Sequence, residues 1–293
     1  MTALGPRNLV IVRAGPSSLH ETFLEGGEPQ FDLILSTFGE APVAPGPAIA
    51  VVRRDGGKFE AIHDLLAGDQ AILERYDYVW IPDDDIEASA PAINAMFALM
   101  REHALEIAQP ALSAGSHWSH AVTLRDPGMR LRFSNFIELM MPCFSAAHLA
   151  RIRPLFRERR FAWGLDAVWT RTMREPAGRA AILDACAMRH VRPVGSGALY
   201  KEGSDPNSEL REMLARFGLR RFPQPCVYGA VSAGGRRFGN GPRLAAALIG
   251  HALRHRRNLP AGDRRRYLKG VRRGAWPHRP ALSPLPVPAE QPA

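Results

Sequence analysis

Residues 76–85 carry the sequence YDYVWIPDDD, an apolar run that ends at a proline and is followed by three acidic residues. Residues 76–81 have the length and the aromatic and β-branched content of a buried strand, and the proline stops it. In open α/β sheets, ligands bind at the carboxyl ends of the strands. The stretch therefore predicts a strand that carries three carboxylates to a ligand-binding edge.

The surrounding sequence alternates further strand-like and helix-like segments. Short apolar runs predict strands at residues 8–13, 31–37, 49–53 and 182–188. Apolar residues spaced i, i+3, i+4, i+7 predict helices at residues 58–66 and 89–107. Residues 109–144 have shorter runs and more turns, which indicates antiparallel or irregular structure. The expected fold class is α/β, a Rossmann-like mixed but mainly parallel sheet flanked by helices.

Composition excludes several classes of protein. The chain has 293 residues, of which 46% are hydrophobic and 23% charged, as in ordinary globular proteins. Its three cysteines include no CxxC pair, which argues against a disulfide framework or a zinc ribbon and favours a reducing cytosol. No apolar stretch approaches the roughly 18 residues of a membrane span, and the N-terminal run is too short for a signal peptide. We expect a cytoplasmic protein with a bacterial composition.

The positive charge is concentrated at the C-terminal end. Of the net charge of +9, residues 236–293 contribute 13 basic side chains against two acids, so the preceding part is close to neutral. We expect one domain at 1–235 and a basic helical extension at 236–293 with a disordered proline-rich end. A basic amphipathic helix can contact anionic lipid, bind nucleic acid, or form a solvated face. Of these, contact with the inner membrane face is favoured over nucleic acid.

The acidic run suggests a cation site. Adjacent carboxylates repel one another, and a hard divalent cation with oxygen ligands relieves this repulsion. Asp83 and Asp85 are two apart, so in an extended loop both project to the same side and could hold one ion. The alternative is a polar turn in which an aspartate caps the following helix.

Three other segments carry candidate residues. The turn at residues 13–18 ends a strand and starts a helix, where Ser18 and Glu21 fit a capping box, and backbone donors there favour phosphate or a nucleotide base edge. Asp166 follows a tryptophan and a glycine, so it could act as a general base or as a helix N-cap. His190 follows a predicted strand and could be a metal ligand or a structural histidine.

Several ordered motifs together resemble a known family. They are YDYVWIPDDDI, QPALS at 109–113, RFSNFIE at 132–138 with MP at 141–142, WGLD at 163–166, and 184–195 with its histidine. The first resembles the DxD segment of GT-A nucleotide-sugar glycosyltransferases. More closely, residues 8–203 resemble the domain of unknown function seven hundred seven. Plant members of that family are often labelled lysine-ketoglutarate-reductase trans-splicing-related.

The resemblance implies a GT-A-like fold and a role for each motif. Manganese or magnesium would be held by Asp83, Asp85 and His190, and would bridge the diphosphate of a nucleotide-sugar donor. Asp84 would lie nearer the ribose or sugar, and Asp166 would be the general base. The residues that would border the nucleotide base are Arg13, Ala14, Gly15 and Ser18. The acceptor-site candidates are Gln109, His117, Trp118, Asn135, Glu138 and Trp163.

Three functions remain open at this point. The first is a metal-dependent glycosyltransferase acting on an unknown glycan, lipid-linked or protein acceptor. The second is a non-catalytic nucleotide- or glycan-binding protein, and the third a nucleic-acid-binding protein that uses the arginine-rich end. Paired His117 and His120 could suggest another metal site, a sugar pocket or a plain loop, and Glu138 needs a partner if buried. The first hypothesis requires the two DxD acids, His190 and Asp166 to meet in one cleft.

Overall fold

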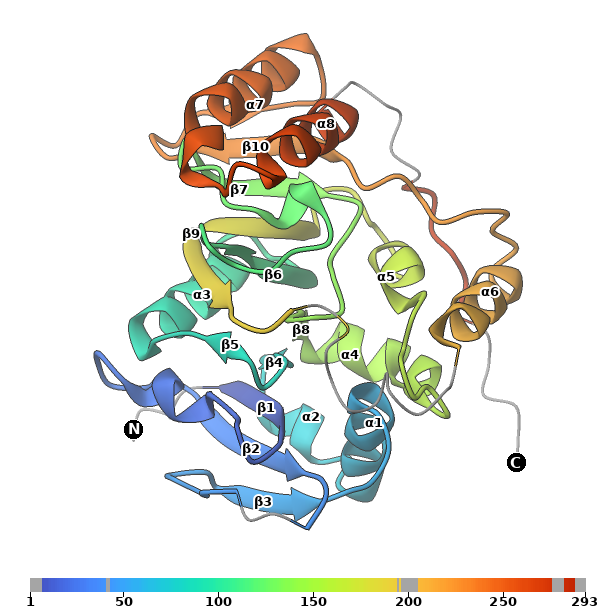
Figure 1. The fold of residues 1–293 in the computed structure, drawn as a ribbon. Coiled ribbons are helices and arrows are strands. Elements are labelled where there is room, and N and C mark those ends of the chain that lie inside the picture. The colour runs from blue at the N-terminus through green and yellow to red at the C-terminus, as the bar shows by residue number, and fades with distance from the viewer. Residues whose placement is uncertain (1–6, 41–42, 194, 196–204, 276–281, 288–293) are drawn as a thin grey trace.

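The computed structural model describes residues 7–40, 43–193, 195, 205–275 and 282–287, and its central feature is one mixed sheet (Figure 1). The strands are β1 (Asn8–Ala14), β2 (Asp32–Thr37), β3 (Ala50–Arg53), β4 (Tyr78–Trp80), β5 (Ile86–Glu87), β6 (Ile107–Leu112), β7 (Met129–Ser134), β8 (Cys143–Ser145), β9 (Ala180–His190), β10 (Val227–Ser232) and β11 (Arg237–Phe238). Their order across the sheet is β11-β10-β7-β9-β6-β8-β4-β1-β2-β3, and β5 pairs with β9.

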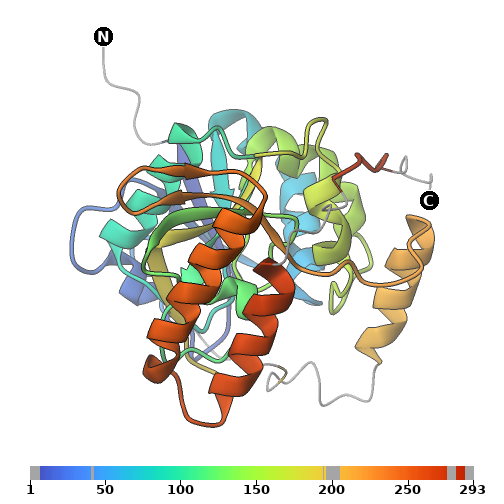
Figure 2. The same ribbon diagram turned by 90° about the horizontal axis from the view of Figure 1, so that it is seen from above.

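Helices flank this sheet on both faces, as Figures 1 and 2 show. They are α1 (Lys58–Gly68), α2 (Ile72–Arg75), α3 (Ala90–Glu102), α4 (Ala146–Ile152), α5 (Leu165–Val168), α6 (Pro206–Arg216), α7 (Pro242–His255) and α8 (Asp263–Ala275). In the part of the chain that the structure describes, none of them is both long and apolar enough to cross a membrane.

Strand β1 shows why the N-terminal half folds as a parallel layered unit. All seven of its residues are buried, and successive side chains of a strand point to opposite faces. Leu9 and Ile11 join the hydrophobic cluster that contains Phe59 of α1, whereas Val10 and Val12 join the cluster that contains Phe97 of α3. A strand covered on both faces is typical of parallel sheets, and β1 pairs in parallel with β2 and β4.

Strand direction differs from the expectation of a mainly parallel sheet. Among the described residues, four strand pairs are parallel, namely β1–β2, β1–β4, β2–β3 and β6–β9, but six are antiparallel. The switch begins at β8, which lies between β4 and β6 and runs against both. Its three residues are too few to show a periodicity, so the sequence carries no signal of their direction. The sheet is therefore mixed rather than mainly parallel.

The helix expected over residues 89–107 is shorter than its apolar pattern suggests. Helix α3 ends at Glu102, and Ala104 adopts a positive φ of 47° that a right-handed helix cannot include. Ile107, which continues the helical spacing, instead begins β6 and pairs with Ala180 of β9. The helical spacing of apolar residues thus continues past the end of α3, because Ile107 of β6 happens to lie at the next position of that pattern.

The C-terminal helices α7 and α8 lie side by side against the sheet (Figures 1 and 2). Leu244 and Leu248 of α7 share a hydrophobic cluster with Val227 and Ala230 of β10. Further along the chain, residues 282–287 contact the body, where the Leu285 N–H donates to the Arg171 carbonyl at 2.7 Å. The remaining residues of the proline-rich end lie outside the described part.

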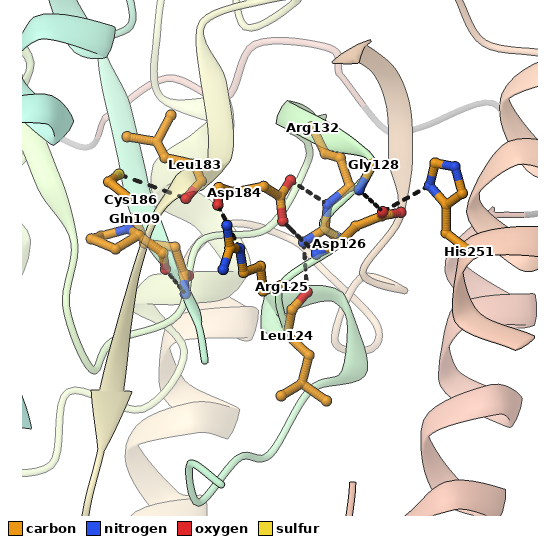
Figure 3. A network of polar contacts seen from close by, with 11 residues as sticks. Gln109, Leu124, Arg125, Asp126, Gly128, Arg132, Leu183, Asp184, Cys186 and His251 are labelled. Atoms are coloured by element: carbon orange, nitrogen blue, oxygen red, sulfur yellow. Dashed lines mark hydrogen bonds and ion pairs between the residues drawn. The ribbon is translucent and has the colours of Figure 1, made fainter. Parts of the chain in front are cut away.

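A buried polar network also ties α7 to the sheet (Figure 3). His251 of α7 lies with Nδ1 2.7 Å from Oδ1 of Asp126, whose backbone N–H donates to Oδ1 of Asp184 at 2.8 Å. Arg132 of β7 binds both oxygens of Asp184 through Nε and Nη2, each at 2.8 Å. Such a bidentate pair fixes its partners geometrically, so the network holds α7 to β7 and β9.

Candidate metal and donor site

A cavity of about 690 Å³ opens where β1 and β4 end. Its walls come from several elements: the end of β1, the loop after β4, the start of α1, the end of β9 and α5. The candidates from the sequence that line it are Arg13, Asp83, Asp84, Asp85, Glu138, Trp163, Asp166 and His190. The two DxD acids, the histidine and the candidate base therefore meet in one cleft, as the glycosyltransferase hypothesis requires.

Backbone hydrogen bonds hold the acidic loop in place. The Asp83 N–H donates to the Met140 carbonyl at 2.7 Å, and the Val191 N–H donates to the Asp85 carbonyl at 3.1 Å. Immediately afterwards β5 pairs with the end of β9, with Ile86 opposite His190. The three aspartates therefore do not cap the next helix, because two residues of strand follow them and α3 begins at Ala90 after Ser89.

His190 is the last residue of β9 rather than a residue beyond the strand. Its Nδ1 lies 2.9 Å from the His117 carbonyl, which can only accept, so Nδ1 carries the hydrogen. Nε2 lies 3.1 Å from Oδ2 of Asp85. Burial is the largest single influence and opposes charge on both groups, but their mutual hydrogen bond and the opposite charges nearby together outweigh it, so the pKa of His190 is raised and that of Asp85 is lowered.

Asp83, Asp85 and His190 have the arrangement of a cation site. One ligand atom from each lies within 4.8 Å of the other two. Among the described residues, nothing hydrogen-bonds to Oδ1 of Asp85, which is buried. A histidine whose Nδ1–H is bound to a carbonyl presents Nε2 to a metal, and carboxylate with imidazole suits manganese or magnesium. The residues present therefore fit the divalent cation that the resemblance implies.

Two basic side chains that the sequence analysis missed also contact these acids. Lys58, the first residue of α1, places Nζ 2.5 Å from Oδ1 of Asp83. Arg192 binds Asp84 through Nη2 and Oδ2 of Asp85 through Nε at 3.3 Å. The Asp83 side chain is 39% exposed, and desolvation by the surrounding protein raises its pKa against the opposing charge of Lys58. Lys58 belongs to no motif, and Arg192 lies in the segment 184–195, where the histidine alone drew attention.

Glu138 and Asp166 are two further buried carboxyls in the same cavity. Burial, and next the charge of Asp166, raise the pKa of Glu138 to about 8, while burial raises the pKa of Asp166 to about 7. In the described part of the chain, Oε2 of Glu138 and Oδ1 of Asp166 have no hydrogen-bond partner. Asp166 lies in the first turn of α5 and is not its N-cap, which is Gly164 with φ of 98°. Both side chains thus offer unpaired oxygens where a ligand could bind.

The turn after β1 contributes mainly backbone. The Gly15 N–H donates to Oδ2 of Asp84 at 2.9 Å, and a Cβ at Gly15 would lie 2.8 Å from the Phe38 ring. Arg13 and Phe38 line the cavity, and the Arg13 guanidinium lies 5.0 Å from the centre of that ring.

Two other residues of this turn point away from the cavity. Ala14 is buried in the core, and Ser18 hydrogen-bonds His20. The expected capping box does not form, because the helix here is a short 3₁₀ turn (His20–Leu24) without a side-chain cap.

Most of the acceptor-site candidates act behind the cavity wall rather than in it. Gln109 accepts the Glu138 N–H at 2.6 Å, and His117 supplies the carbonyl that orients His190. Asn135 is held by backbone groups near β10, and Trp118 lies under the guanidinium of Arg266. None of these four lines the cavity, whereas Glu138 and Trp163 do.

One member of the His117 and His120 pair does reach the cavity. His120 lines it with Ser119, and its ring lies 4.5 Å from that of Phe136 and 6.2 Å from that of Phe222. Burial lowers the pKa of His120 to about 4, which makes it a neutral, partly apolar surface.

Comparison with protein families gives one match. The family described as "Protein of unknown function (DUF707)" matches residues 48–135, which include the acidic run. The resemblance drawn from the motifs is thus confirmed over that stretch. No curated protein matches the chain.

The chain is similar to several solved structures, three of which are the following. TarS (residues 1–349) of S. aureus in complex with UDP-GlcNAc has 12% identity and a TM-score of 0.43, over 92% of this chain and 89% of that one. Glucosyl-3-phosphoglycerate synthase of Mycobacterium tuberculosis, with Mn²⁺, UDP and phosphoglyceric acid, has 14% identity and a TM-score of 0.46, over 79% and 85%. GalNAc-T7 with UDP, GalNAc and Mn²⁺ has 10% identity and a TM-score of 0.46, over 71% and 47%.

Proposed function

We propose that this protein is a metal-dependent glycosyltransferase that moves a sugar from a nucleotide-sugar donor to an acceptor hydroxyl. One observation carries the proposal: the ligand atoms of Asp83, Asp85 and His190 lie within 4.8 Å of one another in a cavity also lined by two carboxyls, each with one oxygen that has no hydrogen-bond partner among the described residues. A cation site beside a candidate proton acceptor is the combination that this transfer needs.

The acidic residues would hold the cation, and the cation would stabilise the leaving group. Asp83 and Asp85 would supply carboxylate oxygens and His190 its Nε2, which the His117 carbonyl already orients. When bound, manganese or magnesium would stabilise the negative charge that develops on the departing diphosphate. Asp84 is tied to the Gly15 backbone and to Arg192, so it would face the nucleoside rather than the cation.

Asp166 would take the proton from the acceptor. Its pKa of about 7, which burial raises, leaves it partly ionised at neutral pH and therefore able both to accept a proton and to release it. Burial is also the main reason that the pKa of Glu138 is about 8. Glu138 is therefore mostly protonated at neutral pH and would donate a hydrogen bond to the acceptor. Trp163 on the same wall offers a flat surface to a sugar ring.

The nucleoside would lie at the end of β1. Phe38 opens 38% of its surface there and has the Arg13 guanidinium against its ring, so a base could stack on its other side. Substitution of Gly15 would push a side chain into this ring, because its Cβ would lie 2.8 Å away. The turn is thus shaped for close approach of a planar group.

A thermal-shift and hydrolysis experiment tests the proposal. Nucleotide sugars of the uridine and guanosine classes are added with and without Mn²⁺, and donor hydrolysis is then followed by release of the nucleoside diphosphate. We expect one class to raise the melting temperature only with the metal, and expect Asp85→Asn to abolish this effect. Asp64→Asn, on α1, serves as the matched control because Asp64 does not line the cavity. Metal-dependent binding without any hydrolysis or transfer would favour the non-catalytic alternative.

We also propose that α8 contacts an anionic membrane surface. Arg265, Lys269 and Arg272 are exposed and spaced i, i+4, i+7, so they lie on one helix face. Sedimentation with phosphatidylglycerol vesicles, but not phosphatidylcholine vesicles, would support this, and Arg265→Glu with Arg272→Glu should abolish it. Arg211→Glu on α6 is the control, and equal binding of both vesicle types would refute the proposal.

A further inference from the structure

The carboxylates of the proposed cation site already hold cations that belong to the chain itself. Lys58 places Nζ 2.5 Å from Oδ1 of Asp83, and Arg192 bridges Asp84 and Asp85. Both basic side chains line the cavity, with 13% and 38% of their surfaces exposed. A divalent cation that binds here must therefore displace or share these partners.

Each basic side chain has a second anchor on the cavity wall. Lys58 Nζ also donates to the Leu139 carbonyl at 2.6 Å and to the Met140 carbonyl at 3.3 Å. Arg192 also donates through Nη1 to Oγ of Ser17 at 3.4 Å. Because of these anchors, each can release its carboxylate and remain in the cavity with its positive charge available to another anion.

We propose that Lys58 and Arg192 exchange partners when ligands bind: they release the three aspartates, of which Asp83 and Asp85 would hold a divalent cation, and bind the diphosphate that arrives with it. This rests on the proposed function, because it takes the cation and the diphosphate as the ligands of the cavity. A dication among three carboxylates and two basic side chains leaves the group with net positive charge, which attracts a diphosphate.

The exchange makes the two ligands bind cooperatively. A cation alone strips Lys58 and Arg192 of their partners, and a diphosphate alone meets three carboxylates that repel it. When both bind, Asp83 and Asp85 face the cation, and the two basic side chains face the diphosphate. By linkage, each ligand must then tighten the other by the same factor, which for such couplings is typically about 5- to 150-fold.

Titration of Mn²⁺ in the presence and absence of a nucleoside diphosphate tests the exchange. Free Mn²⁺ is measured by its electron paramagnetic resonance signal, and UDP and GDP are each used as the added nucleotide. In the wild-type protein we expect one of them to tighten Mn²⁺ binding on the order of tenfold or more. Lys58→Met should bind Mn²⁺ alone more tightly than the wild type, because Asp83 loses its competing ammonium, and should lose most of the coupling.

Two further variants separate the exchange from a structural effect. Arg192→Gln should change coupling in the same direction by less, because Arg192 is the more exposed of the two; it decides the matter if Lys58→Met does not fold. Arg189→Gln is the matched control, since Arg189 lies three residues before Arg192 at the end of β9, pairs with Glu87 at 3.1 Å and lies outside the cavity. It should keep wild-type coupling.

The outcomes distinguish this inference from the function on which it rests. If Mn²⁺ and the nucleotide bind independently, or if Arg192→Gln and Lys58→Met keep wild-type coupling, the exchange is refuted while the cation site stands. If the wild-type protein binds no Mn²⁺ with or without nucleotide, the proposed function fails and the exchange fails with it.

Discussion

Replacement of Glu138 by glutamine should stabilise the fold, and the gain should grow with pH. Glu138 is 6% exposed, and burial, followed by the charge of Asp166, raises its pKa from 4.5 to about 8. The folded state therefore binds this proton more tightly than the unfolded chain. This tighter proton binding by Glu138 stabilises the folded state fully below pH 4.5, and the stabilisation is lost as the pH rises through 8. At about 1.4 kcal/mol per pKa unit, this difference amounts to at most about 5 kcal/mol.

Glutamine has the size of protonated glutamate but cannot ionise. Urea unfolding with a chelator present, at pH 5, 6.5 and 8, should show the variant close to the wild type at pH 5 and several kcal/mol more stable at pH 8. Glu74→Gln on the exposed surface of α2 should show no such trend. Asp166→Asn should flatten the pH dependence of the wild-type residue, because it removes the second cause of the shift. A free-energy difference that is the same at all three pH values would refute the reasoning.

Three further predictions concern other parts of the molecule. Asp166→Asn should lower the rate of diphosphate release by about 10²–10⁴-fold. Because burial raises the pKa of Asp166 to about 7 and the base must be ionised, the wild-type rate should fall about tenfold per pH unit well below 7. A wild-type rate that does not depend on pH would contradict this. Asp184→Asn should cost about 3–5 kcal/mol in urea unfolding, because it leaves the buried Arg132 charge uncompensated; a loss under 1 kcal/mol would show that the network is dispensable. Gly15→Val should weaken nucleotide binding in calorimetry with little change in melting temperature, since its Cβ would meet the Phe38 ring at the cavity rather than the core; unchanged affinity would place the nucleoside elsewhere.

The strands and the acidic loop could be predicted because their signals are local. The run at 8–13 appears as β1 (Asn8–Ala14), and the run at 76–81 as β4 (Tyr78–Trp80). Each contains consecutive apolar residues, 9–12 and 78–81, as a core on both faces of the sheet requires. The acids that follow β4 reach the cavity because backbone hydrogen bonds to Met140 and Val191 fix the conformation of their loop. Spacing of two between Asp83 and Asp85 then put both on the side of His190.

What the sequence could not show depends on contacts between distant segments. Lys58 is 25 residues from Asp83, and Arg192 is 108 residues from Asp84, so no spacing rule links them. Asn135 belongs to a motif but is consumed by hydrogen bonds near β10. Strand direction at β8 likewise depends on which neighbours it inserts between. A motif locates a residue near a site, but only the tertiary contacts decide whether its side chain lines the site or supports it.

The buried acids of this chain fall into two groups that differ in whether their carboxylate oxygens have hydrogen-bond partners. Asp184, in the network beneath α7, accepts hydrogen bonds on both carboxylate oxygens, from Arg132 and from the Asp126 backbone. Among the described residues, the buried carboxylate oxygens without a partner belong to Asp85, Glu138 and Asp166, and all three residues line one cavity. Buried polar groups that serve folding are normally satisfied, and the raised pKa values of Glu138 and Asp166 mean that these two carboxyls stabilise the fold less as the pH rises. A ligand that pairs with their charge or supplies their missing hydrogen bonds explains why these three carboxyls lack partners whereas Asp184 has them.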